Sequence, residues 1–255
     1  MDKAAIKFDE LITIVKKLRS PDGCSWDKEQ THDSLIPYLL EEIYEVIESI
    51  DNKDWKILEE ELGDVLLHIV LQSQIAKESF NFDIASCIER LNKKLIFRHP
   101  NVYGKSQIKN LNWEESKHKE KKRKSRLDGV PKDLSAMVSA QRLQQKASMV
   151  GFDWEKIEYV WDKVYEELDE LKNACISKNN QDIEEEIGDV LFSIVNLSRH
   201  LNCSAENMLR NSNKKFVSRF KILEKKVNEK GKKIENISLN EMDQIWDNIK
   251  QDELV

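Results

Sequence analysis

Glycine and proline are scarce in this chain, and their scarcity bears on the fold. Among 255 residues only seven are glycine and four are proline, whereas Asp, Glu, Lys and Arg make up 35%. Few helix-breaking residues combined with many charged and aliphatic ones favour long helices. No run of strict apolar–polar alternation is long enough to indicate a β-sheet. The sequence therefore predicts an all-α protein.

Long apolar runs, closely spaced cysteines and clustered histidines are also missing. Without an apolar stretch long enough to cross a bilayer we expect no membrane span, and the N-terminal segment lacks the continuous apolar core of a signal peptide. The four cysteines form neither close pairs nor metal-type spacings, which is typical of reduced thiols in a cytoplasmic protein. The net charge of −6 argues against a general nucleic-acid partner.

What the chain does contain is an internal repeat. The segment LEEELGDVLL starts at Leu58, and IEEEIGDVLF starts 125 positions later at Ile183. Three further segment pairs keep the same order: GCSWDKE with GFDWEKI, NKKLIFR with NKKFVSR, and NWEESK with IWDNIK. Their spacing drifts by a few residues, as small loop insertions in a duplicated unit would cause. We therefore expect two homologous halves, about 23–117 and 151–250.

Each half is expected to be a small helical bundle. Apolar residues at spacings of three and four predict amphipathic helices over 33–51, 54–80, 82–97, 154–177, 182–200, 204–230 and 239–250. Ser204 is the expected N-cap of one helix, and Asp133 that of a further helix ending near Met149.

A basic segment joins the two halves. Seven of the ten residues from Lys117 to Arg126 are Lys or Arg. A solvated linker is a more usual meaning of such a run than a nucleic-acid tail. We expect an N-terminal helical domain over 1–117, a basic linker over 118–132 and a C-terminal helical domain over 133–255.

Acidic pairs spaced three residues apart recur on the predicted helices, so that each pair shares a helix face. They are Glu42, Glu45, Glu61 and Asp64 in the first half, and Glu167, Glu170, Glu186 and Asp189 in the second. Glu-rich helices are usually just solvated, but here the acids border the most apolar segments, and carboxylates beside a core need partners. Four convergent carboxylates without sulfur or histidine ligands suit Mg²⁺, with Mn²⁺ as a second choice.

A glycine lies between the acids of the second pair in each half, at Gly63 and Gly188. Because glycine inside a helix costs about 1 kcal/mol relative to alanine, we expect another helix or a ligand to approach closely there. A ferritin-like di-iron site would need Glu-x-x-His pairs on bundle helices, and the predicted helices carry none. His68 is expected to be buried near the acids rather than to bind the metal.

Basic residues complement the acids. Lys94 and Arg98 are four residues apart in the first half, as are Lys215 and Arg219 in the second. They are either surface charges or, beside a metal-loaded acidic cluster, phosphate contacts. Trp246 and Lys250 could stack on a base and hold a charge, although a packing role is the ordinary one for a tryptophan.

Together these motifs resemble the MazG family of nucleoside triphosphate pyrophosphohydrolases, an all-α class. The resemblance covers nearly the whole chain through LRSPDGCSWDKEQTH, YLLEEIYEVIE, KLIFRHPNVYG, AQRLQQKASMVGFDW, KVYEELDEL and MDQIWDNIK, besides the segments quoted above. It implies hydrolysis of NTPs or dNTPs to a nucleoside monophosphate and pyrophosphate, with Mg²⁺ or Mn²⁺. It also implies binding of nucleotides such as ATP, a helical bundle, a homodimer, and a task in cleaning or regulating the nucleotide pool.

The resemblance also implies roles for individual residues. The acids named above take the metal positions, and Glu166 or Glu170 would orient or deprotonate the attacking water. The nucleotide contacts would be Lys163, Glu166, Lys215, Arg219, Trp246 and Lys250, with Lys94, Arg98 and Trp113 as their counterparts in the first half. Because Lys163 falls opposite Tyr38, the second half is favoured as the catalytic one. The chain departs from the family pattern at Ser25, where proline is common, and at Asp182, where a basic residue is usual.

A different class of function remains open on the residues alone. Both halves could sense nucleotides through metal and carboxylates without hydrolysing them, or the chain could act by gripping a partner protein.

Overall fold

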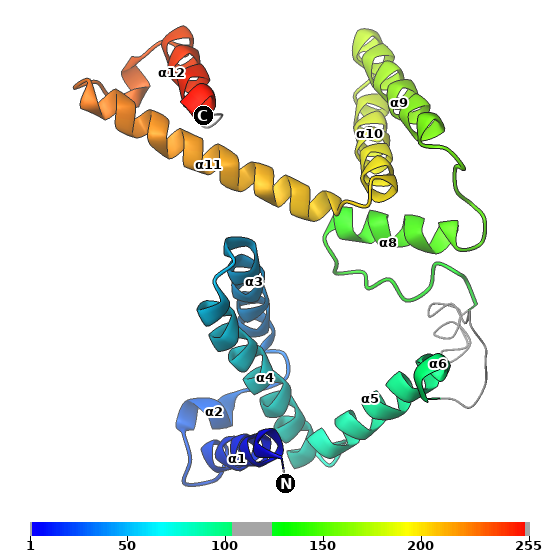
Figure 1. Cartoon of the computed structure of the whole chain (residues 1–255), viewed down its shortest axis with the longest axis vertical. Helices are drawn as coiled ribbons and strands as arrows, with labels where there is room; N and C mark the ends of the chain where they lie inside the picture. Colours follow the sequence, from blue (N-terminus) through cyan, green and yellow to red (C-terminus); the bar gives the residue numbers. More distant parts are fainter. Residues whose placement is uncertain (1, 104–123, 253–255) are drawn as a thin grey trace. The chain divides into compact units, whose positions relative to one another are not determined.

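The computed structural model describes residues 2–103 and 124–252, and every regular element in these ranges is a helix (Figure 1). The all-α expectation is therefore confirmed. The chain divides into two compact units, residues 1–120 and 121–255. The predicted linker over 118–132 lies largely outside the described residues, so its boundaries stay a prediction.

Unit 1 is built on one helical hairpin. Its helices are α1 (Lys3–Leu18), α2 (Ser25–Glu29), α3 (Ile36–Asn52), α4 (Trp55–Glu78), α5 (Ile84–Arg98) and α6 (Pro100–Tyr103). The α3–α4 turn is short because Lys53 adopts a left-handed conformation with φ 56° and Asp54 caps α4, accepting from Lys56 N and Ile57 N at 3.1 Å. The hairpin aligns the acidic segments of α3 and α4 along each other.

The core of unit 1 lies where α1 packs on α4. Its buried residues are Val15, Leu35, Val70, Leu71 and Ile75. Behind α1 the chain turns tightly at Gly23, where a Cβ atom would lie 2.0 Å from the Leu18 carbonyl oxygen. Only glycine fits this approach.

Unit 2 repeats the hairpin. Its helices are α8 (Ala136–Ser148), α9 (Ile157–Ser177), α10 (Asn180–His200), α11 (Ala205–Glu229), the 3₁₀ turn η1 (Ile234–Asn236) and α12 (Leu239–Asp252). Lys178 is left-handed with φ 57°, and Asn179 caps α10, as Lys53 and Asp54 do in unit 1. Figure 1 shows α9 and α10 as one pair, α8 across its base, and α11 running away from it to α12.

Buried residues in unit 2 fall into two groups. Val160, Val164 and Leu197 form the core of the α9–α10 pair. A second cluster joins α11 and α12 through Leu223, Val227, Ile237, Ile245 and Ile249. The α11–α12 pair therefore has an apolar core of its own.

Helix boundaries follow the predictions with two corrections. Ser204 caps α11 as expected, accepting from Asn207 N at 3.4 Å. The predicted cap Asp133 is wrong: α8 begins later, and Ser135 caps it by accepting from Val138 N at 3.4 Å. The helix expected from Trp154 begins at Ile157, because residues 152–156 form a loop that the next subsection describes.

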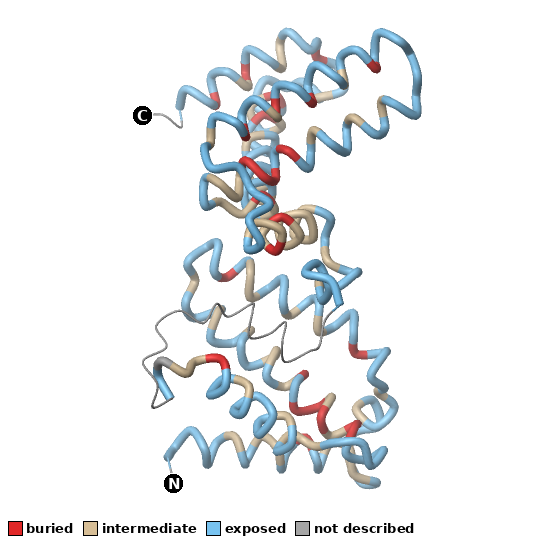
Figure 2. The backbone as a smooth tube through the Cα atoms, turned by 90° about the vertical axis from the view of Figure 1, so that its right-hand side faces the viewer, coloured by how far each residue is buried: buried red, intermediate tan, exposed pale blue. Residues whose placement is uncertain are grey.

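Many apolar side chains of the hairpins face outward, and Figure 2 shows long exposed stretches between the buried positions. On α9 and α10 they include Trp161, Tyr165, Leu168, Ile187, Leu191 and Ile194. Among the described helices, none is both long and apolar enough to cross a membrane.

Candidate functional site

The hairpin of unit 2 brings its four predicted acids together. Carboxylate oxygens of Glu167, Glu186 and Asp189 lie within 4.8 Å of one another. Glu170, one turn along α9 from Glu167, is close enough for its charge to act on Glu186. The i, i+3 spacing places two acids of each helix on the face that meets the other helix.

The electrostatics of this cluster favour a cation. Burial, together with the charges of Glu170, Glu167 and Asp189, raises the pKa of Glu186. Its Oε2 atom is buried and has no hydrogen-bond partner among the described residues. An orphaned carboxylate oxygen beside three more carboxylates is what an oxygen-seeking divalent cation requires, so these residues fit Mg²⁺ or Mn²⁺.

Lys163 extends the cluster toward solvent. Its Nζ lies 2.7 Å from carboxylate oxygens of both Glu166 and Glu167, and these hydrogen bonds raise its pKa, so it stays charged. Glu167 itself is only 6% exposed. In unit 1 the equivalent residue is Tyr38, whose ring packs edge-on against Trp26 at 5.7 Å between centroids. The loss of the cation in unit 1 is thus a replacement by an aromatic contact.

Unit 1 gathers acids in the same way. Carboxylate oxygens of Glu42, Glu45 and Glu61 lie within 4.8 Å of one another. Burial raises the pKa of Glu42 to about 7, and the charges of Asp64, Glu45 and Glu61 add to this effect. Without a cation, four carboxylates on one hairpin repel each other enough to hold a proton near neutral pH.

His68 is buried beneath this cluster, as expected. Burial lowers its pKa, against an opposing effect of Asp64, so the ring is neutral at pH 7. Its Nδ1 atom has no hydrogen-bond partner in the described part of the chain.

The paired glycines are not explained by helix packing. A Cβ atom built on Gly63 or Gly188 would meet no heavy atom within 4 Å. The expectation that another helix of the chain approaches them closely is therefore wrong for the described residues. Both positions face open space beside the acids, which leaves the ligand alternative.

The predicted basic contacts lie in other places. Lys94 lines a broad groove along α5 with Arg90 and Lys93, whereas Arg98 is buried. Lys215 and Arg219 lie on α11, which runs away from the α9–α10 pair in Figure 1. A single chain therefore does not bring the α11 cations to the acids of its own unit.

The α12 residues are also held apart from the acids. Trp246 packs on Phe216 of α11 at 5.4 Å between ring centroids. Lys250 pairs with Asp247 at 2.7 Å. Trp113 lies outside the described residues, so its role in the first half stays a prediction.

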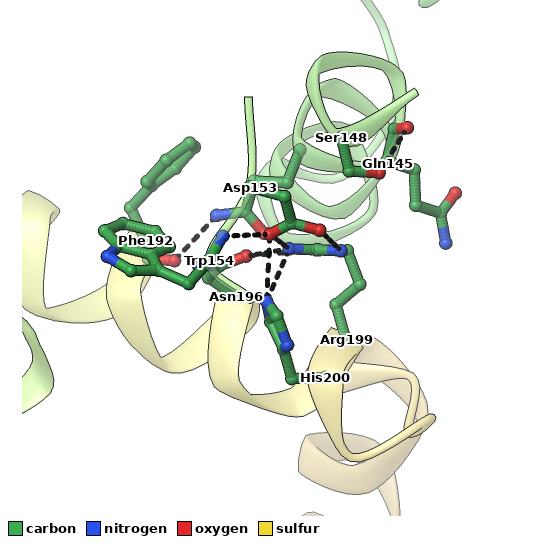
Figure 3. Close-up of polar contacts among 9 residues, drawn as sticks. Gln145, Ser148, Asp153, Trp154, Phe192, Asn196, Arg199 and His200 are labelled. Carbon is green, nitrogen blue, oxygen red and sulfur yellow. Dashed lines mark hydrogen bonds and ion pairs between the residues drawn. The ribbon is translucent and has the colours of Figure 1, made fainter. Parts of the chain in front are cut away.

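A polar network that the sequence did not single out ties the loop before α9 to the end of α10 (Figure 3). Asp153 accepts hydrogen bonds from Arg199 Nη1 at 2.8 Å and shares one with His200 Nε2 at 2.9 Å. Asn196 Oδ1 accepts from Arg199 Nε at 3.1 Å. Burial alone would raise the pKa of Asp153, but these hydrogen bonds lower it, so it is ionised. The GFDW segment and the Arg-His pair near the end of α10 were the available signals.

Comparisons with known proteins agree with this geometry. The family model described as the MazG nucleotide pyrophosphohydrolase domain matches twice, at residues 30–103 and 156–223. Each match contains one α-helical hairpin with its four acids.

Relatives cover the whole length of the chain. It is 48% identical over 253 residues to the Thermotoga maritima protein named nucleoside triphosphate pyrophosphohydrolase/pyrophosphatase MazG, covering 98% of both chains. It is 40% identical to the Escherichia coli nucleoside triphosphate pyrophosphohydrolase, covering 97% of this chain and 98% of that protein. It is also 39% identical to the uncharacterized protein YabN of Bacillus subtilis, over 97% of this chain and 52% of that protein.

Two family matches in tandem, full-length relatives and two acid-bearing hairpins agree with one another. The chain belongs to the MazG family of nucleotide pyrophosphohydrolases.

Proposed function

We propose that this protein hydrolyses nucleoside triphosphates to a nucleoside monophosphate and pyrophosphate, and that unit 2 carries the reaction. The observation that carries the proposal is the acid cluster of α9 and α10, with its orphaned Glu186 oxygen next to a charged lysine. Unit 1 has the acids without the lysine. A supporting comparison is the printed activity of the relatives that match the whole chain.

Mg²⁺, or Mn²⁺ in its place, would be held by Glu167, Glu170, Glu186 and Asp189. When bound, such an ion neutralises phosphate charge and makes a coordinated water more acidic. The donor set consists of carboxylates alone, which suits these hard cations better than softer ones.

The chain's own groups account for the proton and the charge. Glu170 is exposed next to the cluster, and Glu166 lies on the solvent side of Lys163. Either carboxylate accepts the proton of the water that attacks the α-phosphorus. The new bond joins the water oxygen to that phosphorus, the bond to the bridging oxygen breaks, and pyrophosphate takes the electron pair. Lys163 stabilises the negative charge of the phosphates as it grows.

The test is a product analysis with matched variants. The protein is incubated with each common NTP and dNTP plus Mg²⁺, and the products are separated by anion-exchange chromatography. Monophosphate with pyrophosphate, abolished by chelation, is the expected result. Diphosphate with phosphate would refute α–β cleavage, and no turnover with either metal would favour a non-hydrolytic nucleotide sensor.

Two glutamates separate catalysis from general acidity. Glu170→Gln abolishes turnover with an unchanged far-UV helical spectrum, whereas Glu184→Gln, an exposed residue of α10 outside the cluster, leaves turnover intact. Glu45→Gln, at the position in unit 1 that matches Glu170, retains most of the activity. Loss of turnover in Glu45→Gln but not in Glu170→Gln would move the reaction to unit 1.

We further propose that the protein is a homodimer. The outward-facing apolar residues of α9 and α10 would otherwise remain in water, where large exposed apolar patches are uncommon on monomers. Because Lys215 and Arg219 do not reach the acids of their own chain, a second copy would have to supply them. Mixing Glu170→Gln with Lys215→Ala chains tests this: restored turnover supports sharing between copies, and none contradicts it.

The remaining proposals concern the setting of the protein. All four cysteines are free thiols, which suits the reducing cytoplasm. The net charge of −6 gives no reason to expect nucleic acid as a partner. Removal or regulation of nucleotides in the cellular pool is the corresponding task.

A further inference from the structure

A cavity of about 370 Å³ lies in unit 2 beside the acid cluster. It is enclosed by α8, the loop before α9, and α9 and α10, and its lining includes Lys163, Glu167 and Asp189. Its volume falls in the range of roughly 300–1,000 Å³ that small-molecule sites occupy. A nucleotide whose phosphates bind at the acids can therefore place the rest of the molecule in this cavity.

The walls of the cavity are mostly apolar and aromatic. Phe152 and Trp154 come from the loop, and Phe192 comes from α10. Figure 3 shows Trp154 and Phe192 on the same side of the Asp153 network, which fastens the loop to α10. Aromatic side chains are the usual surfaces on which nucleobases stack, whatever the base.

One buried polar group in the lining lacks a partner. Gln144 of α8 is 8% exposed, and its Nε2 donates to the Phe192 carbonyl oxygen at 2.8 Å. This bond fixes the orientation of the amide, so the other atom is the acceptor Oε1, which is buried and has no partner among the described residues. An unpaired buried acceptor is costly, and a ligand with an N–H group would satisfy it.

Unit 1 shows that the fold does not need this cavity. The Leu18 carbonyl accepts from Cys24 N at 2.8 Å, and the Ala147 carbonyl accepts from Phe152 N at 3.2 Å. These matching turns align α1 with α8, and Asp64 with Asp189 aligns α4 with α10. On this register unit 1 has Val15, Leu18 and Leu71 where unit 2 has Gln144, Ala147 and Asn196.

The exchange changes what the space can hold. Val15 and Leu71 belong to the buried core of unit 1. Unit 2 replaces these large apolar groups with a small residue and two polar ones, all lining the cavity. Polar groups placed where the homologous unit has a packed core weaken that core, which is typical of a binding site.

We propose that this cavity binds the nucleoside part of the nucleotide, with Gln144 Oε1 accepting a hydrogen bond from an N–H group of the base. The inference rests on the proposed nucleotide substrate, and it places the base at α8 rather than at Trp246. Any common base offers an N–H donor, so the site accepts a nucleobase class rather than one base.

The test uses three substitutions on α8 that introduce the residues of unit 1. Ala147→Leu fills the cavity, Gln144→Val removes the acceptor, and Gln145→Lys, outside the cavity lining, is the matched control. Calorimetry measures the Kd of α,β-methylene nucleoside triphosphates, which resist cleavage, and of inorganic tripolyphosphate, both with Mg²⁺. The measurement needs no turnover, so it judges the cavity even if the proposed reaction fails.

We expect Ala147→Leu to raise the analogue Kd at least about tenfold and Gln144→Val about 3- to 10-fold, the range of one lost neutral hydrogen bond. The Kd of tripolyphosphate should change less than about twofold in both, and Gln145→Lys should change neither Kd. Unchanged analogue binding in both cavity variants would overturn the proposal. Equal weakening of analogue and tripolyphosphate would also overturn it, because the defect would then lie at the acids.

Discussion

Replacing Glu42 by glutamine should make the metal-free protein more stable. Glutamine keeps the shape of the side chain and removes one of four like charges on the α3–α4 hairpin. The pKa of Glu42 rises from 4.5 to about 7 in the folded protein. Since one pKa unit corresponds to about 1.4 kcal/mol, the full difference is about 3 kcal/mol, which solvent screening of this partly exposed group reduces to about 1–2 kcal/mol.

The effect must depend on pH in a defined direction. Because the folded pKa lies above the unfolded one, the native state holds a proton that the unfolded state has already released between pH 4.5 and 7. The wild type therefore loses stability relative to Glu42→Gln as the pH rises through this window. The difference is fully developed above about pH 7 and absent below about pH 4, where both forms are neutral.

Scanning calorimetry of the full chain without metal, at pH 4 and pH 8, measures this prediction. A gain of about 1–2 kcal/mol corresponds to a Tm increase of roughly 3–8 °C for a unit of this size. Glu48→Gln, an exposed residue of α3 outside the cluster, is the control and should leave the Tm unchanged. A Glu42→Gln protein that is no more stable than wild type at pH 8 would refute the repulsion.

Divalent metal should reverse the order. A ligand present at a hundred times its Kd stabilises the native state by about 2.7 kcal/mol. Saturating Mg²⁺ should therefore raise the Tm of the wild type more than that of Glu42→Gln, which has lost a ligand. Equal metal-induced shifts in both proteins would show that Glu42 does not bind the ion.

Three further outcomes follow from unit 2. Asp153→Ala leaves the nearly buried Arg199 guanidinium without its carboxylate and should cost about 1.5–3 kcal/mol in urea unfolding, whereas Glu10→Gln, at a solvated ion pair with Lys7, should cost less than about 0.5 kcal/mol. Lys163→Tyr, which introduces the residue of unit 1, should lower kcat/KM about 100-fold in steady-state kinetics. Gly188→Ala should raise the metal-free stability by about 1 kcal/mol, since its Cβ meets no described atom, and weaker substrate binding in the same variant would show that a ligand passes there.

Much of the local structure could be read from the residues. The repeat of LEEELGDVLL as IEEEIGDVLF predicted two equivalent hairpins, and the i, i+3 spacing predicted which carboxylates share a face. Both are short-range properties of a helix, which is why they survive without tertiary information. Ser204 was a correct cap, but Asp133 was not, because Ser135 offers an equally good hydroxyl two residues later and packing decides between them.

The sequence by itself determined the all-α fold, the duplication and the two sets of acids, since each follows from helical periodicity or from direct repetition. Only the tertiary structure decided that Glu186 has an orphaned buried oxygen, that Asp153 fastens its loop to Arg199, and that Gln144 lines a cavity. These features join α8, α9 and α10 across tens of residues. Burial and hydrogen bonding depend on which side chains meet in space, and no local pattern along the chain encodes that meeting.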